Sequence, residues 1–211
     1  LSIKTARKAV IEKVQIHLTD KATDTASIID EKVTALFRFI EGIARMPDLY
    51  DSARSYEEKV KFLKQEAKLN NKILELDITD AKGRFYYDGG SIQVGDREWF
   101  QTALSGTNFV SEPYIEKANG TLVVTLAVPV YNAAHTIVGV LSADIKGILL
   151  SQDIAGIIVG KTGLCYVLGL TGTTIADRDT TLVETQFNAS ELAKTDSSLI
   201  TLGEFEKIAL K

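Results

Sequence analysis

The sequence predicts an α+β fold in which a long N-terminal helix is followed by antiparallel sheet. Apolar residues recur every three or four positions at first and every second position after about residue 70, which indicates a change from helix to strand. Further on, two long β-rich segments are joined by a short turn, as in an antiparallel meander. With 211 residues, 45% of them hydrophobic, the chain can build one large domain or two small ones.

The first element is a long amphipathic helix. Its apolar residues are Ile11, Val14, Leu18, Ala22, Ala26, Ile29, Val33, Leu36, Ile40 and Ile43. Charged residues lie between them, so the pattern is that of a helix with one apolar stripe. We expect it to begin near residue 3 and to end at Met46–Pro47, because proline cannot continue the hydrogen-bond ladder. At ~1.5 Å per residue such a helix spans about 60 Å, so it must run along two modules or extend beyond one.

The next elements introduce the sheet. A second helix is expected over 56–69, from its apolar spacing and interleaved charges. Leu74, Leu76 and Ile78 then alternate with polar residues, which predicts a strand with one buried face. A turn over 80–83, a strand over 84–87 and a break at 88–90 follow.

The middle of the chain predicts one short helix and an antiparallel meander. The helix has Asp96 as its cap and ends at Ser105–Gly106. The elements expected after it are an extended segment over 108–111, a hairpin turn at Asn119–Gly120, a strand over 121–130, a turn over 132–135 and a strand over 136–145.

The C-terminal third repeats, in outline, the order of elements between residues 70 and 90. We expect a connecting helix over 147–158, a turn over 160–163, strands over 164–168 and 173–176, and a helical segment over 190–211. This order predicts the start of a second, related module. No strands follow residue 211 to close a second sheet, so we expect that module to be incomplete in this chain.

Composition and motifs exclude several classes of function. A net charge of −4 and the lack of a Lys/Arg run argue against nucleic acid as a partner. His17 and His135 have no second ligand at a suitable spacing, so no metal site is expected. Cys165 has no disulfide partner, and its apolar neighbours predict a buried small side chain. No nucleotide-binding loop, nucleophile elbow or other catalytic or cofactor motif is found, so we expect neither an enzyme nor a cofactor. No apolar run reaches the roughly 20 residues that span a bilayer.

The residues from 96 to 144 contain the best candidate site. Arg97 offers a planar, permanently charged fork for a carboxylate, and Trp99 and Tyr114 offer flat walls with one donor each. Asp144 lies in an otherwise apolar strand, where an unpaired carboxylate is costly. It needs a partner, which is either a protein group such as Arg97 or a ligand ammonium. In the second case, Arg97 and Asp144 form the two poles of a site for a zwitterion.

Several motifs in this order resemble the double Cache (dCache) sensor domains. They are DREWFQTALSG over 96–106, SEPY over 111–114, LAVPV over 126–130, GVLSADI over 139–145, and GKTG over 160–163 with GTTIA over 172–176. Each motif is weak alone, but five motifs in the right order make the resemblance strong, and the match covers nearly the whole chain.

The resemblance implies two PAS-like antiparallel sheet modules along one long N-terminal helix, the second module being incomplete here. It implies the boundaries 1–50 for the helix, 51–147 for the membrane-distal ligand-binding module, and 148–211 for the connecting helix and the start of the membrane-proximal module. It also implies the extracytoplasmic part of a membrane-anchored bacterial receptor, homodimeric when complete. A chemotaxis receptor is preferred over a sensor kinase or a cyclic-nucleotide enzyme.

The amino-acid-binding subset of that family implies roles for individual residues. There, the positions of Arg97 and Trp99 hold the ligand carboxylate, and those of Tyr114 and Asp144 hold the ammonium. This chain departs from the pattern at three positions, where Ile92, Phe100 and Glu116 replace two tyrosines and an aspartate. The expected ligand-binding set is Arg97, Trp99, Phe100, Tyr114, Glu116 and Asp144.

The charge poles persist despite these departures, so an α-amino acid is the first expectation. A ligand with only one pole, an amine or a carboxylate, is the alternative. A further alternative is a module that binds no small molecule and acts through a protein partner or through dimerisation. A hydrolase has no supporting constellation of residues.

Overall fold

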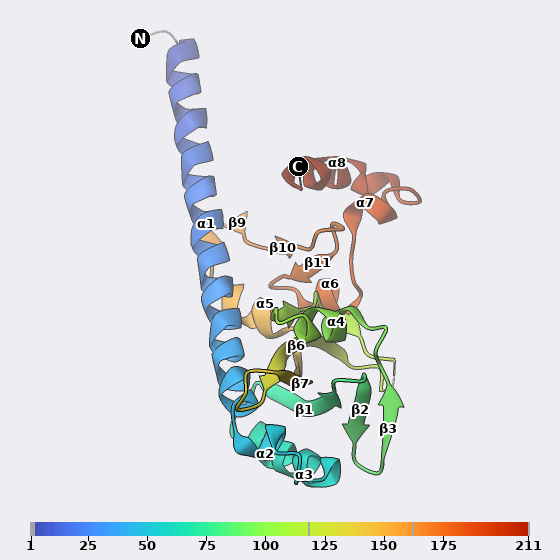
Figure 1. Ribbon diagram of the computed structural model, residues 1–211. Coiled ribbons are helices and arrows are strands. Elements are labelled where there is room, and N and C mark those ends of the chain that lie inside the picture. Colours follow the sequence, from blue (N-terminus) through green and yellow to red (C-terminus); the bar gives the residue numbers. More distant parts are fainter. Residues whose placement is uncertain (1–2, 118, 162, 211) are drawn as a thin grey trace. The chain divides into compact units, whose positions relative to one another are not determined.

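The computed structural model describes residues 3–117, 119–161 and 163–210. The chain divides into two compact units, one of residues 34–149 and one of residues 1–33 with 150–211. The first helix, α1 (Ile3–Ala44), contributes residues to both. Its bounds confirm the predicted long helix and its end before Pro47 (Figure 1).

The unit of residues 34–149 is built on one antiparallel sheet. Its elements after α1 are α2 (Pro47–Tyr50), α3 (Tyr56–Ala67), β1 (Ile73–Asp80), β2 (Arg84–Tyr87), β3 (Gly90–Gln93), α4 (Glu98–Leu104), β4 (Phe109–Val110), β5 (Tyr114–Ile115), β6 (Leu122–Tyr131) and β7 (Ile137–Lys146). Seven strands of the described chain pair in the order β3-β2-β1-β7-β6-β4, and β5 also pairs with β6. The predicted meander of β6 and β7 is confirmed, whereas β3 was not predicted.

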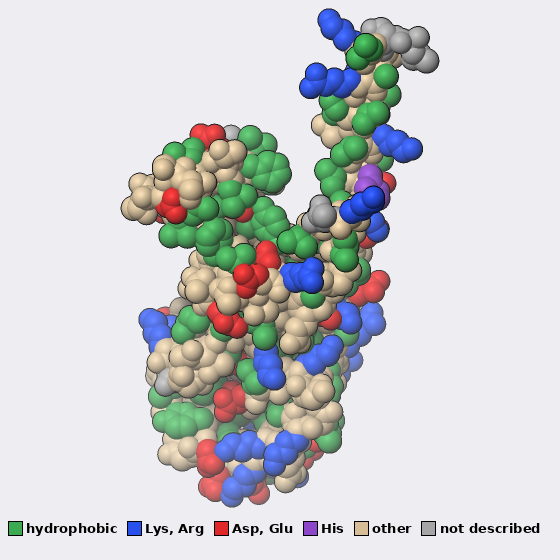
Figure 2. Space-filling view, turned by 180° about the vertical axis from the view of Figure 1, so that it is seen from behind, with side chains coloured by type: hydrophobic (Ala, Val, Ile, Leu, Met, Phe, Trp, Pro, Cys, Tyr) green, Lys and Arg blue, Asp and Glu red, His purple; other side chains and the backbone are tan. Residues whose placement is uncertain are grey.

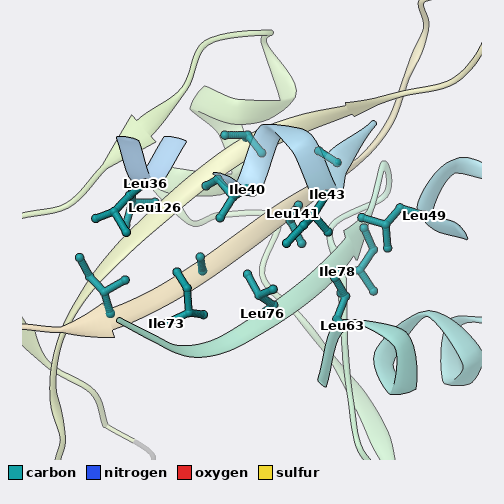
Figure 3. Packing of buried hydrophobic residues seen from close by; sticks show 14 of the residues in the cluster. Leu36, Ile40, Ile43, Leu49, Leu63, Ile73, Leu76, Ile78, Leu126 and Leu141 are labelled. Atoms are coloured by element: carbon teal, nitrogen blue, oxygen red, sulfur yellow. The ribbon is translucent and has the colours of Figure 1, made fainter. Parts of the chain in front are cut away.

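One face of this sheet carries the main hydrophobic core. Figure 3 shows Leu36, Ile40 and Ile43 of α1 beside the strands, together with Leu49 of α2 and Leu63 of α3. The sheet contributes Ile73, Leu76, Ile78, Val124, Leu126, Val128, Val130, Leu141, Ala143 and Ile145. Burying each Leu or Ile stabilises the fold by about 1.5–3 kcal/mol, so this layer holds the C-terminal part of α1 to the sheet.

The helix α3 begins with a complete capping box. The Ser55 side chain accepts a hydrogen bond from the Glu58 amide, and the Glu58 carboxylate accepts one from the Ser55 amide. Lys59, in the first turn, is buried and donates from Nζ to the Leu49 carbonyl at 2.6 Å. These contacts fix α3 against α2.

The strand β1 differs from the predicted simple alternation. Leu74, expected to face the core, is 42% exposed, whereas Ile73 and Leu76 are buried. The pairing of β1 with β7 shifts register just after Ile73, as a β-bulge does. The extra residue changes which side chains face the core. One buried face was also wrong for the later part of the strand, because Asp77 is buried on the opposite face.

That opposite face is covered in part by α4. Phe100 and Ala103 of α4 pack with Ala127 of β6 and Val140 of β7 in a second, smaller cluster. The helix ends at Ser105, and Gly106 follows with φ +94°, a conformation that favours glycine. The predicted end of this helix is confirmed, and it leaves the neighbouring part of the face for the candidate site.

The other unit contains short elements besides its part of α1. They are α5 (Leu149–Ile154), β8 (Ile158–Val159), β9 (Gly163–Leu164), β10 (Val167–Leu168), β11 (Thr174–Ala176), α6 (Thr180–Glu184), α7 (Ala189–Leu192), a 3₁₀ helix (Ser197–Leu199) and α8 (Ile200–Ala209). The strands form two-stranded antiparallel pairs, β8 with β9 and β10 with β11. None of the described helices combines the length and apolar character that crossing a bilayer requires.

Several expectations for this unit were wrong in detail. The connecting helix predicted over 147–158 is shorter, since α5 spans Leu149–Ile154 and Ile158 already begins β8. The single strand predicted over 164–168 is split into β9 and β10, and Cys165 between them is half-buried, with Sγ 3.7 Å from Thr25 Oγ1. The helical segment predicted over 190–211 is divided into α7, the 3₁₀ helix and α8. The Asp196 side chain accepts a hydrogen bond from the Ser198 amide and so caps a new helical start. Thr162, in the predicted turn over 160–163, and residue 211 lie outside the described residues.

Candidate functional site

The candidate site lies on the sheet face that carries α4. Side chains directly opposite each other in paired strands share a face, and the register defines two adjacent rows across β1, β7 and β6. The first row is Glu75, Asp144 and Thr125, and the second is Asp77, Ser142 and Ala127. Polar side chains thus replace apolar ones on this face beyond the cluster under α4.

The start of α4 brings Arg97 and Trp99 to these rows. Arg97 is the N-cap residue, with extended backbone (φ −77°, ψ 135°) and no side-chain capping bond. The prediction that Asp96 caps the helix was therefore wrong, because the chain enters its first helical turn one residue later. Asp96 is solvent-exposed, 3.9 Å from the Arg97 Nε. The Arg97 side chain lines the candidate cavity instead of capping the helix.

A chain of hydroxyl groups ends at Asp144. The Thr125 hydroxyl donates to Asp144 Oδ1 at 2.5 Å, and the Tyr114 hydroxyl lies 2.8 Å from the same Thr125 oxygen. Since a hydroxyl has one hydrogen to give, and Thr125 gives its own to Asp144, Tyr114 donates to Thr125. One Asp144 oxygen is thereby held in place, and the other is left for a further partner.

A cavity of about 170 Å³ joins these groups. Its lining consists of Asp77, Phe85, Ile92, Val94, Arg97, Trp99, Tyr114, Glu116, Thr125, Ser142 and Asp144. Five of the six predicted site residues therefore surround one space. The sixth, Phe100, is buried in the cluster under α4 and meets the Trp99 ring edge-on at 6.0 Å. Ile92, noted as a departure from the family pattern, lines the cavity and is 53% exposed.

Arg97 and Asp144 do not pair with each other. Among the described residues, the ion pair recorded for Arg97 is the one with Asp96, and its side chain is 59% exposed. The structural alternative left open by the sequence, a salt bridge that closes the site, is therefore not the arrangement found. A positive and a negative pole face the same cavity without neutralising each other.

The cavity contains one more carboxylic side chain than the sequence predicted, that of Asp77. Asp77 was missed, although it is an acid among apolar residues of a strand, the same signal that singled out Asp144. Burial raises the pKa of Asp77 to about 8, with further increases from Glu75, Asp144 and Glu116. Burial also raises the pKa of Asp144 to about 6, against the opposing hydrogen bond from Thr125. Both carboxyl groups are thus poised to gain from a nearby cation.

Two other polar lining residues were also missed. Thr125 and Ser142 are buried polar residues on the site face of β6 and β7. Nothing in the local sequence distinguishes them from polar residues on a solvent-facing strand. Only the strand register, which sets them beside Asp144 and Asp77, reveals their place.

A larger hollow, of about 480 Å³, lies between α3 and the turn from β2 to β3. Its charged groups already have partners, since Lys64 bonds Asp88 at 2.7 Å and Lys61 bonds Glu57 at 2.8 Å. It therefore offers less to a charged ligand than the smaller cavity does. Within the described ranges, no group of His, Cys, Asp and Glu residues is arranged to hold a metal ion.

Comparison with known sequences identifies a family. The sequence model of the Cache domain (dCache_1) matches residues 2–209. Methyl-accepting chemotaxis protein TlpA of Bacillus subtilis (strain 168) is 25% identical over 175 residues, which is 77% of this chain and 26% of that protein. The chain therefore spans about a quarter of the length of this curated relative.

Solved structures share the fold. The ligand-binding domain of Pseudomonas fluorescens chemoreceptor CtaA, in complex with L-isoleucine, has a TM-score of 0.69 at 22% identity, over 91% of this chain and 79% of that one. The ligand-binding domain of the Pseudomonas aeruginosa PAO1 amino acid chemoreceptor PctC, in complex with GABA, has a TM-score of 0.65 at 21% identity, over 85% and 81%. The sensory domain of Campylobacter jejuni chemoreceptor Tlp3, with isoleucine bound, has a TM-score of 0.64 at 18% identity, over 93% and 84%.

Proposed function

The chain belongs to the Cache domain family, and from this premise we propose that it is the extracytoplasmic ligand-sensing domain of a membrane-anchored signalling receptor. A chemotaxis receptor is the preferred parent, as the match to TlpA suggests. In this proposal the domain binds and reports a ligand and catalyses no reaction. Turnover of a generic ester or phosphate substrate by the pure protein would contradict that part.

The proposed ligand is a small zwitterion such as an α-amino acid. The observation that carries this proposal is that Arg97 and Asp144, which have opposite charges, line one cavity without pairing with each other. Arg97 would hold the carboxylate through its guanidinium, with Trp99 as a wall beside it. Asp144 would accept the ammonium, with Tyr114 and Glu116 close by. The neighbours solved with L-isoleucine and GABA, both of which carry an ammonium and a carboxylate, support this assignment.

A ligand with only an ammonium is the second candidate. The cavity has three carboxylic side chains, those of Asp77, Glu116 and Asp144, but a single guanidinium. Ile92, where the family pattern has a tyrosine, also lines the cavity and offers no hydroxyl to a ligand carboxylate. An amine ligand would need only these carboxylic side chains and would make no ion pair with the guanidinium.

The test is ligand-dependent stabilisation of ligand-free protein. A ligand that binds only the folded state at a hundredfold its Kd stabilises by about 2.7 kcal/mol, which circular dichroism detects as a higher Tm. We expect one or a few amino acids to raise the Tm, and Arg97→Ala and Asp144→Ala to abolish the increase. Arg45→Ala and Asp20→Asn, which remove exposed charges outside the cavity, are the matched controls.

The outcomes separate the alternatives. A Tm increase with amines that persists in Arg97→Ala would favour the amine ligand. If a broad panel of amino acids, amines and organic acids leaves the Tm unchanged, the proposed ligand site is wrong, and a protein partner or dimerisation becomes the remaining role. A bound ligand would shift the receptor only by its difference in affinity for two conformations.

A further inference from the structure

Asp77 is a buried acid that the zwitterion site does not use. Its side chain lines the cavity, yet the residue is only 6% exposed. No hydrogen bond or ion pair joins its carboxylate to another residue in the part of the chain that the structure describes. Burying a carboxylate without a partner is costly, so the ionised form of Asp77 is disfavoured among the described residues until a cation approaches it.

The surroundings of Asp77 make that cost larger. The charged groups facing it are chiefly acidic, namely Glu75 on the same strand, Asp144 on β7 and Glu116 after β5. The opposing influence comes from Lys64, whose ammonium is already bonded to Asp88 at 2.7 Å. Directly across on β7 lies Ser142, which is neutral. A neutral residue at this position would fill the same space with a smaller loss of folding free energy. An acid here is therefore better explained if a cation enters the cavity and pairs with it.

A ligand with one carboxylate and one ammonium would provide no cation for Asp77. Its carboxylate would neutralise Arg97 and its ammonium would neutralise Asp144, and Asp77 would remain buried without a partner. Asp77 and Asp144 lie in adjacent rows on neighbouring strands, a diagonal relation in which Cα atoms are roughly 7–8 Å apart. That separation allows each carboxylate its own ammonium.

On the basis of the proposed function, we infer that the ligand is a cationic α-amino acid with a second ammonium on its side chain, and that Asp77 is the residue that selects it. Arg97 holds the carboxylate, Asp144 the α-ammonium and Asp77 the side-chain ammonium. Glu116 adds negative charge to the same cavity.

Two isosteric ligands test this inference. L-ornithine and L-norleucine have side chains of equal length that differ in a terminal ammonium or methyl group. Isothermal titration calorimetry should show L-ornithine, or its longer homologue L-lysine, binding at least about tenfold more tightly than L-norleucine, the ratio expected for a charged hydrogen bond. Asp77→Asn, which keeps the shape, should remove this preference and leave L-norleucine binding unchanged.

The control is Asp20→Asn. Asp20 is an exposed acid of α1 outside the cavity lining, so its substitution should leave the preference for L-ornithine in place. Circular dichroism should show that both variants are folded.

The contrary outcomes are distinct. If L-norleucine binds as tightly as L-ornithine, or if Asp77→Asn weakens both equally, then Asp77 and Asp144 share one ammonium and the inference fails, while the proposed function stands. If neither amino acid binds but putrescine does, with or without Arg97, the proposed amino-acid ligand and the inference fail together. If none of the three binds, the small-molecule site itself is wrong.

Discussion

Asp77 should make the stability of the ligand-free protein depend on pH. Its pKa is raised by burial to about 8, and that of Asp144 to about 6, whereas an unfolded aspartate has a pKa of roughly 3.9. Between these values the folded state holds protons that the unfolded chain releases. The contribution of these two groups to the free energy of unfolding is therefore largest below about pH 4 and decreases as pH rises through 8.

Asp77→Asn removes the group whose pKa differs more between the folded and the unfolded state. We expect the variant to be more stable than the parent at pH 8 by about 2 kcal/mol or more, and nearly equal to it at pH 4. Urea unfolding at pH 4, 6 and 8 measures the difference, and Asp20→Asn serves as the control because Asp20 is exposed and lies outside the cavity. Parallel stability curves for Asp77→Asn and the parent would show that Asp77 is ionised in the folded state.

At the residue scale, the sequence predicts those site residues that have unusual chemistry for their position. Arg97, Trp99, Tyr114, Glu116 and Asp144 were all predicted, and the structure places all five around one cavity. Their roles with a ligand stay a prediction. Thr125 could not be predicted, because its importance comes from a hydroxyl that bridges two residues distant in sequence.

At the scale of elements, Gly139 limits how closely β1 and β7 can pair. A Cβ at this position would lie 2.5 Å from the Thr79 carbonyl oxygen, which is far inside van der Waals contact. We expect Gly139→Ala to destabilise the protein by about 1–3 kcal/mol, since overpacking forces the strands apart. Urea unfolding at constant pH measures the loss.

Gly42 provides the matched comparison. It lies in α1, and a Cβ there would meet nothing within 4 Å. Gly42→Ala should stabilise the protein by about 0.5–1 kcal/mol, because alanine loses less backbone entropy in a helix. Equal effects of the two substitutions would contradict the close approach at Gly139.

The elements themselves were predictable where the periodicity was long. The apolar stripe of α1 and the alternation in β6 and β7 predicted their extent, since each pattern repeats over many residues. β1 was harder, because its bulge breaks the alternation after one residue and both faces are buried later. β3 was missed because it begins with glycine and serine, which give no apolar alternation. It is a strand because it pairs with β2.

At the scale of the whole molecule, the N-terminal part of α1 presents apolar side chains to solvent. Ile11, Val14 and Leu18 are each exposed and lie at helical spacing on one stripe. Figure 2 shows hydrophobic side chains interspersed with basic ones along this part of the helix. The homodimer implied by the family resemblance stays a prediction, and this stripe is the surface on which to test it.

Val14→Glu should weaken any self-association that uses the stripe, because a charge there would be buried at the contact. Sedimentation equilibrium measures the monomer–dimer constant, and Gln15→Glu, which adds the same charge at the adjacent exposed position, is the control. Neither substitution should change monomer stability by more than roughly 0.5 kcal/mol, since both residues are exposed. An association constant that is equal in both variants and the parent would exclude the stripe as the contact.

The division of the chain at residues 50 and 147 also stays a prediction. Contact within the structure groups residues 34–149 together, so that the last turns of α1 belong with the sheet. Sequence periodicity predicts α1 as one continuous helix. It cannot show that the two parts of this helix belong to different units of the chain.

The chain has a single tryptophan, Trp99, and it lines the candidate cavity. Its indole is held edge-on against the buried Phe100, so the ring has a fixed place at the wall of the site. Indole emission depends on the polarity around the ring, and no other residue of this chain gives that signal. The indole is therefore an optical probe at the cavity wall, and its emission can be used, without any label, to test whether a ligand occupies the cavity.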